Sequence, residues 1–345
     1  MIYHSQPPFP AAGFFSKVKQ FLKSEAGAVV LWVTGALLLA ATLSPWIYQG
    51  GKALAEAAAA RELAGIWEWL GAACGRAKFS RFFSRSLALS ALVLLPFLFR
   101  RVRKLRASGK PAATSAGTGW KSALLQIAIG CLIAGGILWA VCMILQAVGA
   151  YSPAPNPPAL GKLLSKISIP AVAAPLVEEP LFRGLLLGLW LRSAKPLTAC
   201  LGTSLIFAFL HFLEPPAGMS IANPASAFAG FELLGKLLFH FTDPRFFVTD
   251  FATLFGVGMI LAMARVRTGA LWFSIGLHAG WVVAFKACNL LLKPVSDHPL
   301  RPWGVGENLR SGLLPLLALI ITAVICHFVL RYFQRPLPTV SPASP

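Results

Sequence analysis

The stretch "AAPLVEEPLFRGLLLGLW", residues 173–190, places three charged side chains in a segment otherwise apolar enough to cross a lipid bilayer. They are the adjacent Glu178 and Glu179, and Arg183 four positions after Glu179. On insertion scales, a charged side chain at the centre of a membrane helix costs about 2.5–3.5 kcal/mol. Such residues therefore face the interior of a helix bundle and mark a functional site.

The composition is that of a membrane protein. Of the 345 residues, 57% are hydrophobic and 12% are charged, whereas soluble domains carry about 25% charged residues. Apolar stretches recur at the length of about 20 residues that crosses a bilayer core about 30 Å thick. An outer-membrane barrel would instead show short alternating strands. We expect an all-α fold, a polytopic membrane helix bundle with about eight transmembrane helices, at residues 27–48, 82–100, 122–148, 165–191, 196–213, 247–264, 269–292 and 311–330.

The net charge of +19 invites a nucleic-acid interpretation, but its placement favours a membrane topology. Clusters of basic residues flank alternate predicted helices and so gather on one side. By the positive-inside rule that side is cytoplasmic, and both termini are expected there. We predict contacts with anionic lipid headgroups and no nucleic-acid partner. The basic residues are Lys17, Lys19, Lys23, Arg100, Arg101, Arg103, Lys104, Arg106, Lys110, Arg192, Lys195, Arg265, Arg267, Arg331 and Arg335.

A basic and then small-residue linker, "RVRKLRASGKPAATSAGTG" at residues 101–119, divides the chain. We predict an N-terminal two-helix section at 1–119 that ends in this cytoplasmic linker, and a six-helix core at 120–335. The tail at 336–345 is rich in proline and serine, a composition typical of disorder.

Cysteines are scattered, mostly within the predicted helices, and no CxxC pair occurs. We interpret them as small buried apolar residues. They are Cys74, Cys131, Cys142, Cys200, Cys288 and Cys326.

Helical spacing separates the roles of the two central glutamates. Glu179 and Arg183 lie at i, i+4 and share a helix face, so an ion pair between them would neutralise both charges. Glu178 points about 100° away and is left available for chemistry. Pro175 and Pro180 loosen the backbone around them, which is tolerated where protein or water satisfies the freed groups.

Two histidines in other predicted helices lie at a similar depth to Glu178. Counted from the nearest basic residue on the cytoplasmic side, Glu178 is 14 residues deep, His211 is 16 and His278 is 11. At 1.5 Å per residue these depths are roughly 21, 24 and 17 Å. A single transmembrane histidine is more often an interhelical hydrogen-bonding residue. Polar groups from three helices in one layer indicate a shared site instead.

A carboxylate and two imidazoles support two kinds of hydrolysis. A carboxylate in apolar surroundings is suited to act as a general base, one histidine would position the water, and the other would stabilise a developing oxyanion. Alternatively, Glu178, His211 and His278 match the ligands of a catalytic zinc with an open position. The sequence leaves open whether the site uses no cofactor or a divalent metal such as zinc.

Three motifs together resemble the CPBP family of intramembrane proteases, also called the Abi or type II CAAX endopeptidase family. The resemblance covers about residues 120–292 and lies in the order and spacing of EExxxR, FxxxH and a third histidine motif. The matching stretches are "EEPLFR" (Glu178, Glu179, Arg183), "FAFLH" (Phe207, His211) and "SIGLHAGWV" (His278).

The resemblance implies a conical helical bundle with an active site open to the membrane and the cytoplasm. It implies that Glu178 activates water with the help of His211, and that His278 stabilises the oxyanion. Glu179 and Arg183 are implied to be structural or to orient the substrate. Both metal-dependent and metal-free mechanisms are associated with this family.

One position departs from the family pattern. Many members carry asparagine four residues after the last histidine, where this chain has Val282. Asn289 lies about 16 Å further along the helix axis and cannot replace it. The oxyanion would then be held by His278 alone, or with the indole N–H of Trp281, or activity would be reduced.

We predict an intramembrane endopeptidase that hydrolyses a peptide bond in a membrane-associated protein or peptide. Compact loops and short polar termini favour the bacterial inner membrane. The alternative is a non-catalytic membrane scaffold or immunity protein with the same fold, which Val282 favours. A transporter is disfavoured because the sequence has no internal repeat.

Overall fold

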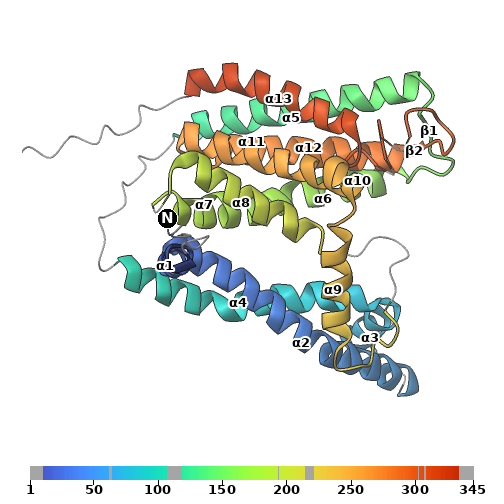
Figure 1. Cartoon of the computed structure of the whole chain (residues 1–345). Coiled ribbons are helices and arrows are strands. Elements are labelled where there is room, and N and C mark those ends of the chain that lie inside the picture. The colour runs from blue at the N-terminus through green and yellow to red at the C-terminus, as the bar shows by residue number, and fades with distance from the viewer. Residues whose placement is uncertain are drawn as a thin grey trace, which may run out of the picture. The chain divides into compact units, whose positions relative to one another are not determined.

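Helices make up nearly all of the part of the chain that the computed structural model describes, which is residues 11–61, 64–106, 119–192, 194–213, 221–301, 303–306 and 308–333. The strands within these residues are β1 (Tyr151–Pro153) and β2 (Leu292–Pro294), which pair antiparallel with Tyr151 opposite Pro294 (Figure 1). The prediction of an all-α membrane bundle is confirmed. Residues 107–118 of the predicted linker and the whole predicted tail lie outside the described residues.

Each of the eight stretches predicted to span the membrane contains a helix. The elements before the first strand are α1 (Ala11–Leu22), α2 (Glu25–Ala60), α3 (Ile66–Arg76), α4 (Phe79–Arg106) and α5 (Trp120–Ala147). The middle of the chain forms α6 (Leu160–Glu179), the π-helical turn η1 (Pro180–Leu186), α7 (Leu187–Trp190), α8 (Pro196–His211) and α9 (Ala229–His240). The last elements are α10 (Pro244–Phe246), the π-helical turn η2 (Phe247–Phe251), α11 (Ala252–Thr268), α12 (Trp272–Leu291) and α13 (Leu313–Phe333).

Within the described residues, 7 helical segments are long and apolar enough to cross a membrane. One of them is the continuous run of α6, η1 and α7, at Leu160–Trp190. The eighth predicted span is α8, which has 16 residues and is therefore about 24 Å long. This is shorter than a hydrocarbon core of about 30 Å. The chain is an integral multi-pass membrane protein.

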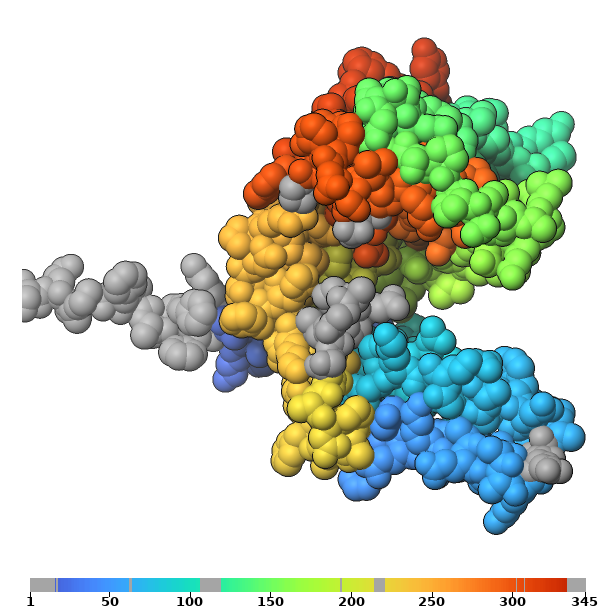
Figure 2. Space-filling view, turned by 90° about the vertical axis from the view of Figure 1, so that its right-hand side faces the viewer, coloured from blue at the N-terminus to red at the C-terminus, as the bar shows by residue number. Residues whose placement is uncertain are grey.

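The described helices belong to two compact units. The first consists of Met1–Ala112 and Leu213–Leu237, and the second of Ala113–Phe212 and Leu238–Pro345. In the first unit, Gly230 of α9 packs directly on the backbone of Ala41 in α2. The Gln49 side chain donates a hydrogen bond of 2.7 Å to the Ala225 carbonyl. Figure 2 shows α9, in yellow, against the blue helices of the first unit.

Helices α5 and α12 form the closest pair of the second unit. They run in the same direction, because Gly130 contacts Gly276 and, further along both helices, Gly135 contacts Gly280. Glycine has no side chain, so the two backbones can approach closely. Membrane helices associate through close packing of this kind, because lipid is as apolar as protein. This contact fixes the position of the α12 residues that reach the site.

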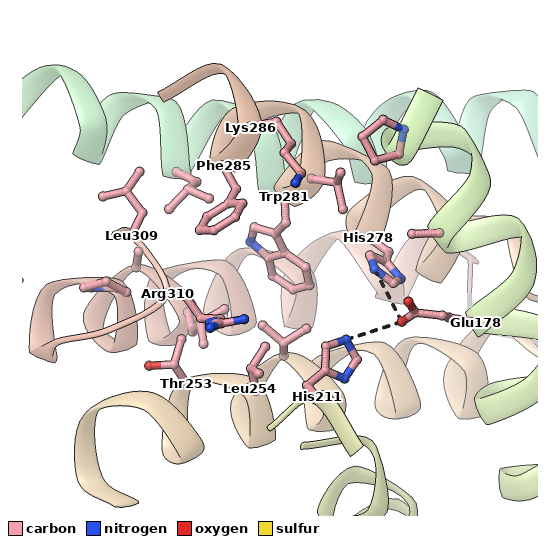
Figure 3. Close-up of a pocket in the computed structure, with 18 of the residues that line it drawn as sticks. Glu178, His211, Thr253, Leu254, His278, Trp281, Phe285, Lys286, Leu309 and Arg310 are labelled. Atoms are coloured by element: carbon pink, nitrogen blue, oxygen red, sulfur yellow. Dashed lines mark ion pairs between the residues drawn. The ribbon is translucent and has the colours of Figure 1, made fainter. Parts of the chain in front are cut away.

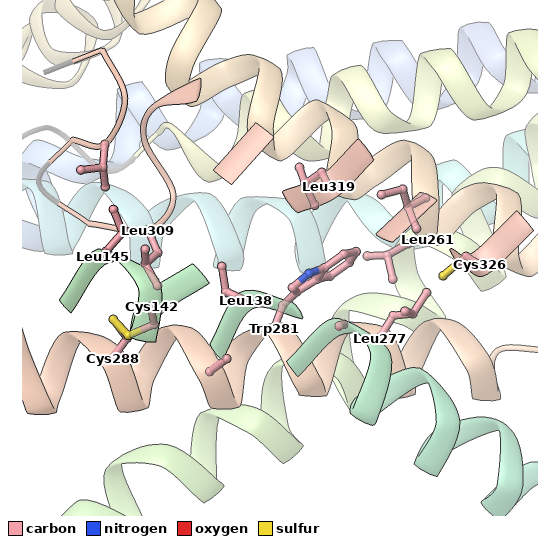
Figure 4. Packing of buried hydrophobic residues seen from close by; sticks show 14 of the residues in the cluster. Leu138, Cys142, Leu145, Leu261, Leu277, Trp281, Cys288, Leu309, Leu319 and Cys326 are labelled. Atoms are coloured by element: carbon pink, nitrogen blue, oxygen red, sulfur yellow. A yellow bond between two sulfur atoms is a disulfide. The ribbon is translucent and has the colours of Figure 1, made fainter. Parts of the chain in front are cut away.

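A disulfide between Cys142 of α5 and Cys288 of α12 lies further along the same contact (Figure 4). The expectation that all cysteines are isolated apolar residues is therefore wrong for this pair. The disulfide lies near the C-terminal ends of both helices, where the β1–β2 ribbon also forms. We call this end of the second unit the ribbon end. The four free cysteines are Cys74, Cys131, Cys200 and Cys326.

We expect Gly280→Ala to destabilise the second unit. Its Cβ would overlap the Cys131 carbonyl and lie 2.8 Å from the Gly135 nitrogen, and overpacking of this kind typically costs about 1–3 kcal/mol. The matched control is Gly136→Ala, because a Cβ at Gly136 meets nothing within 4 Å. Melting of the two purified variants in detergent compares them, and equal melting temperatures would contradict the close contact.

Candidate active site

The two glutamates occupy the last turn of α6, directly before the helix changes geometry. Pro180 follows and starts η1, because proline lacks the N–H that would continue the regular hydrogen-bond ladder. Single π-helical turns inside α-helices often occur at functional sites. The neighbouring side chains meet different surroundings: Glu179 is 0% exposed, whereas Glu178 is 27% exposed.

The predicted pair of Glu179 and Arg183 is confirmed. Arg183 Nη1 lies 3.2 Å from Glu179 Oε1, and both side chains are buried. Arg183 Nη2 also donates a hydrogen bond of 3.3 Å to the carbonyl of Gly258 in α11. The guanidinium lies over the ring of Phe207 in α8, 4.3 Å from its centroid, a cation–π contact. Arg183 therefore joins its own helix to two others.

The same oxygen of Glu179 also binds a histidine, which the sequence did not reveal. His278 Nδ1 of α12 lies 2.9 Å from Glu179 Oε1. A carboxylate accepts hydrogen bonds, so Nδ1 carries the proton and donates. This bond fixes the tautomer of His278 and leaves Nε2 on the opposite edge of the ring. Glu179 thus orients a second residue of the site in addition to neutralising Arg183.

His211 is held in a similar way at the end of α8. Its Nδ1 donates a hydrogen bond of 2.8 Å to the carbonyl of Phe207, one turn earlier. Its ring packs against the Phe207 ring, with centroids 4.2 Å apart. Phe207, the first residue of the FxxxH motif, also supports the Arg183 guanidinium on the same ring.

Both histidines turn their remaining nitrogen towards Glu178 (Figure 3). Glu178 Oε2 lies 3.5 Å from His211 Nε2 and 3.9 Å from His278 Nε2. These distances exceed those of well-formed hydrogen bonds, and Oε2 makes none to the residues described. Neutral imidazoles with protonated Nδ1 atoms present lone pairs to the carboxylate. A donor between these atoms is required, and a water molecule could donate to two of the three.

The site opens into a pocket of about 380 Å³, lined by residues of all the long helices of the second unit. Trp281 and Val282 lie on its wall, one turn after His278. Figure 3 shows the indole nitrogen of Trp281 on the side of its ring away from Glu178, and its role as an oxyanion donor stays a prediction. The sequence reasoning also missed Lys286 and Arg310, two cationic residues of the lining.

The ring tautomers of His211 and His278 are those that metal-bound histidines adopt. Metal-bound histidines usually donate their other N–H to a carboxylate or a carbonyl, as His278 and His211 do here. Within the described ranges, however, no group of three or more His, Cys, Asp or Glu side chains is arranged to hold a metal ion. A zinc bound by Glu178, His211 and His278 stays a prediction.

Comparison with known proteins identifies the central part of the chain. Residues 161–284 match the Rce1-like family, described as type II CAAX prenyl endopeptidase Rce1-like. The matched segment contains α6, α8, α11 and most of α12, and so includes Glu178, His211 and His278. No curated protein and no solved structure matches the chain.

We expect Glu179→Gln to lower stability strongly. The substitution leaves the buried guanidinium of Arg183 without its charge partner, and breaking a buried ion pair typically costs about 3–5 kcal/mol. The control is Glu232→Gln, which breaks an i, i+4 pair of similar chemistry with Lys236, at 2.7 Å, on the protein surface. Exposed pairs contribute little. Thermal melting of both variants tests this, and similar small shifts would show that the buried pair is dispensable.

Proposed function

Because residues 161–284 form a domain of the type II CAAX protease family, we propose that this protein is an intramembrane endopeptidase in which Glu178 activates water to hydrolyse a peptide bond. The substrate is a membrane-associated protein or peptide. The bacterial inner membrane, with both termini in the cytoplasm, is part of the same proposal.

The observation that carries the proposal is the meeting of Glu178, His211 and His278 beside a pocket among membrane-spanning helices. They come from α6, α8 and α12, and each histidine is held by a hydrogen bond of its own. Glu178 and His211 are each 27% exposed and both line the pocket, which is the space that a substrate and water would occupy. Buried structural pairs, such as Glu179 and Arg183, have no such access.

In the first step, Glu178 acts as the general base. A water molecule near Glu178 Oε2 gives one proton to this oxygen, and the water oxygen bonds to the carbonyl carbon of the substrate. His211 Nε2, whose lone pair faces the same space, accepts a hydrogen bond from the second O–H of the water and so orients the attack. A positioned general base typically contributes about 10²–10⁴ in rate.

In the second step, the carbonyl oxygen that has become negative needs a donor. His278 can donate from Nε2 when its ring carries both protons, while its Nδ1 stays hydrogen-bonded to Glu179. Preorganised donors of this kind commonly supply about 2.7–4 kcal/mol each. Collapse of the intermediate breaks the C–N bond, and the proton held by Glu178 passes to the leaving nitrogen.

Glu179 and Arg183 act through other residues in this scheme. Glu179 sets the orientation of His278, while Arg183 pairs with Glu179 and supports Phe207 beneath His211. Val282, where many family members carry asparagine, leaves His278 as the oxyanion donor of this scheme. No step of this scheme passes through a metal ion, and a divalent metal held by Glu178, His211 and His278 stays the alternative.

We expect Glu178→Gln to fold like the parent and to lose about 10²–10⁴ of the cleavage rate, the usual contribution of a general base. The assay incubates purified protein in nanodiscs with a mixture of lipid-anchored peptides in H₂¹⁸O, and mass spectrometry identifies the products. Hydrolysis places ¹⁸O in the new carboxyl group.

Full activity of Glu178→Gln would refute the role of this carboxylate. If the parent cleaves none of the peptides but binds them, the result would support the alternative of a non-catalytic scaffold.

We expect chelators to leave the reaction unchanged. Treatment with EDTA or 1,10-phenanthroline before the same assay removes accessible divalent ions without affecting a carboxylate base. Loss of product formation that is restored by added zinc would instead support Glu178, His211 and His278 as metal ligands.

A further inference from the structure

Helices α11 and α13 end side by side in the second unit. Near their starts, a Cβ at Gly256 of α11 would lie 3.2 Å from Leu319 Cδ1 of α13. Further along both helices, Arg267 of α11 meets His327 of α13. The two helices therefore run in the same direction. Helix α12 begins directly after α11 and runs to the ribbon end, so the last turns of α11 and α13 lie at the opposite end of the unit.

One imidazole lies between two guanidiniums at this place. Both terminal nitrogens of Arg267, Nη1 and Nη2, lie 3.1 Å from His327 Nδ1. At the other edge of the ring, Arg331 Nη2 lies 3.1 Å from His327 Nε2. Arg331 also lies over the ring of Phe328, 5.3 Å from its centroid, and this cation–π contact helps to hold the guanidinium beside the imidazole. We call Arg267, His327 and Arg331 the helix-end cluster.

The helix-end cluster holds more hydrogen-bond donors than acceptors. A guanidinium has five N–H donors and no acceptor, and a neutral imidazole offers one acceptor nitrogen. The lone pair of His327 can therefore serve Arg267 or Arg331 but not both, and the other guanidinium faces an N–H group. The two guanidiniums also repel each other, because they are like charges on either side of one ring. A negatively charged acceptor that reaches both of them would remove the mismatch and the repulsion.

No acidic side chain supplies this acceptor within the described part of the chain, where neither Arg267 nor Arg331 forms an ion pair with a carboxylate. The nearest acidic residues in the sequence are Asp250 for Arg267 and Glu307 for Arg331. They precede the starts of α11 and α13, whereas the helix-end cluster lies where these helices end. The arrangement points to an anion from outside the chain.

The surface next to the helix-end cluster favours a lipid over a free anion. His327 and Arg331 continue an apolar row on one face of α13, which consists of Ile320 and Val324. The four positions follow the i, i+4, i+7 and i+11 spacing of a single helix face. Both apolar residues are exposed, as is Met263 of α11. The row from Ile320 to Arg331 is about 16 Å long, roughly one leaflet of a hydrocarbon core about 30 Å thick, and its charges lie at one end.

We propose that the helix-end cluster binds an anionic phospholipid, whose phosphate accepts hydrogen bonds from Arg267 and Arg331 and whose acyl chain lies along Val324. Guanidiniums match phosphate oxygens in bidentate geometry, and basic pockets between membrane helices bind acidic headgroups. The choline or ethanolamine of a zwitterionic lipid adds a cation that the cluster repels. Phosphatidylglycerol adds none and represents the preferred class. This site lies outside the pocket and does not depend on the proposed function.

The first experiment measures lipid binding to the purified full chain by native mass spectrometry. The protein in detergent is titrated with phosphatidylglycerol or with phosphatidylcholine of the same acyl chains, and an apparent Kd is obtained for each bound lipid. We expect the first phosphatidylglycerol to bind more tightly than phosphatidylcholine. Arg267→Gln with Arg331→Gln should weaken it at least about tenfold, because two charge-assisted contacts to the phosphate are lost. Equal affinities of the parent for the two lipids would overturn the proposal.

The matched control removes two charges at the same end of the unit. Lys121 is exposed in the first turn of α5, which runs parallel to α12, and the exposed Lys195 directly precedes α8. Helix α8 runs antiparallel to α11, because Phe212 after its end contacts Phe251 before the start of α11. We expect Lys121→Gln with Lys195→Gln to leave phosphatidylglycerol binding unchanged. An equal loss in both double variants would show attraction by net charge alone and overturn the site.

A competition arm separates a lipid from a free anion. We expect inorganic phosphate to leave the bound phosphatidylglycerol in place, because phosphate makes no contact with the apolar row. Displacement by inorganic phosphate would show a free-anion site and overturn the lipid assignment. Should Arg267→Gln with Arg331→Gln fail to fold, Arg331→Gln alone changes an exposed position. We expect it to weaken phosphatidylglycerol binding several-fold, and unchanged binding would contradict the proposal.

The second experiment locates the acyl chain. Phosphatidylglycerol with a diazirine in one acyl chain is incorporated into nanodiscs with the full chain, and mass spectrometry of the peptides identifies the sites of photo-crosslinking. We expect crosslinks at Val324 and Met263 that Arg267→Gln with Arg331→Gln reduces. Crosslinks to other helices only, or crosslinks that this variant does not change, would overturn the site. Lipid binding needs no catalysis, so the result stands apart from the Glu178→Gln assay and the two proposals can fail separately.

Discussion

The fully buried carboxylate of Glu179 is the constraint on which the rest of the site depends. One of its oxygens contacts the Arg183 guanidinium, on the same helical run, and the imidazole of His278, from α12. An ionised group removed from water is costly unless partners compensate it. The packing of α6 against α12 therefore requires both partners. The same contacts contribute to the stability of the fold and set the orientation of His278. Arg183 extends the arrangement to Gly258 of α11 and to Phe207 of α8.

Adjacent glutamates thereby acquire different properties from their surroundings. Glu179 accepts hydrogen bonds on Oε1 from Arg183 and His278 and is closed to solvent. Glu178 instead faces two imidazole nitrogens beside a pocket. The tautomers of His211 and His278 follow from acceptors on the far side of each ring, a backbone carbonyl and Glu179. Chemistry at Glu178 is thus prepared by groups that do not touch the reacting atoms themselves, which is the usual role of residues that support an active site.

The contact of α5 with α12 provides the rigid wall that this arrangement requires. Paired glycines bring the helix backbones together, and the disulfide of Cys142 and Cys288 links the helices beyond the last glycine pair. The pocket lies against this wall and continues towards the same end of the unit. A helix fixed at several points along its length can hold His278 in place beside Glu178, and its Lys286, two turns further, also lines the pocket. Rigid elements place functional groups more accurately than loops do.

The sequence by itself determined the membrane class, the positions of the helices, the Glu179–Arg183 pair and the meeting of Glu178, His211 and His278 in one layer. Each of these follows from local periodicity and from the cost of charge in lipid, which act along one segment at a time. Only the tertiary structure decided that His278 binds Glu179, that Arg183 reaches Gly258, and that Cys142 pairs with Cys288, because these contacts join segments up to 146 residues apart. The two cysteines do lie near the same predicted ends of their helices, which was a usable signal. Nothing local indicates which faces of α5 and α12 meet, and it is that meeting which places Lys286 and Arg310 on the wall of the pocket.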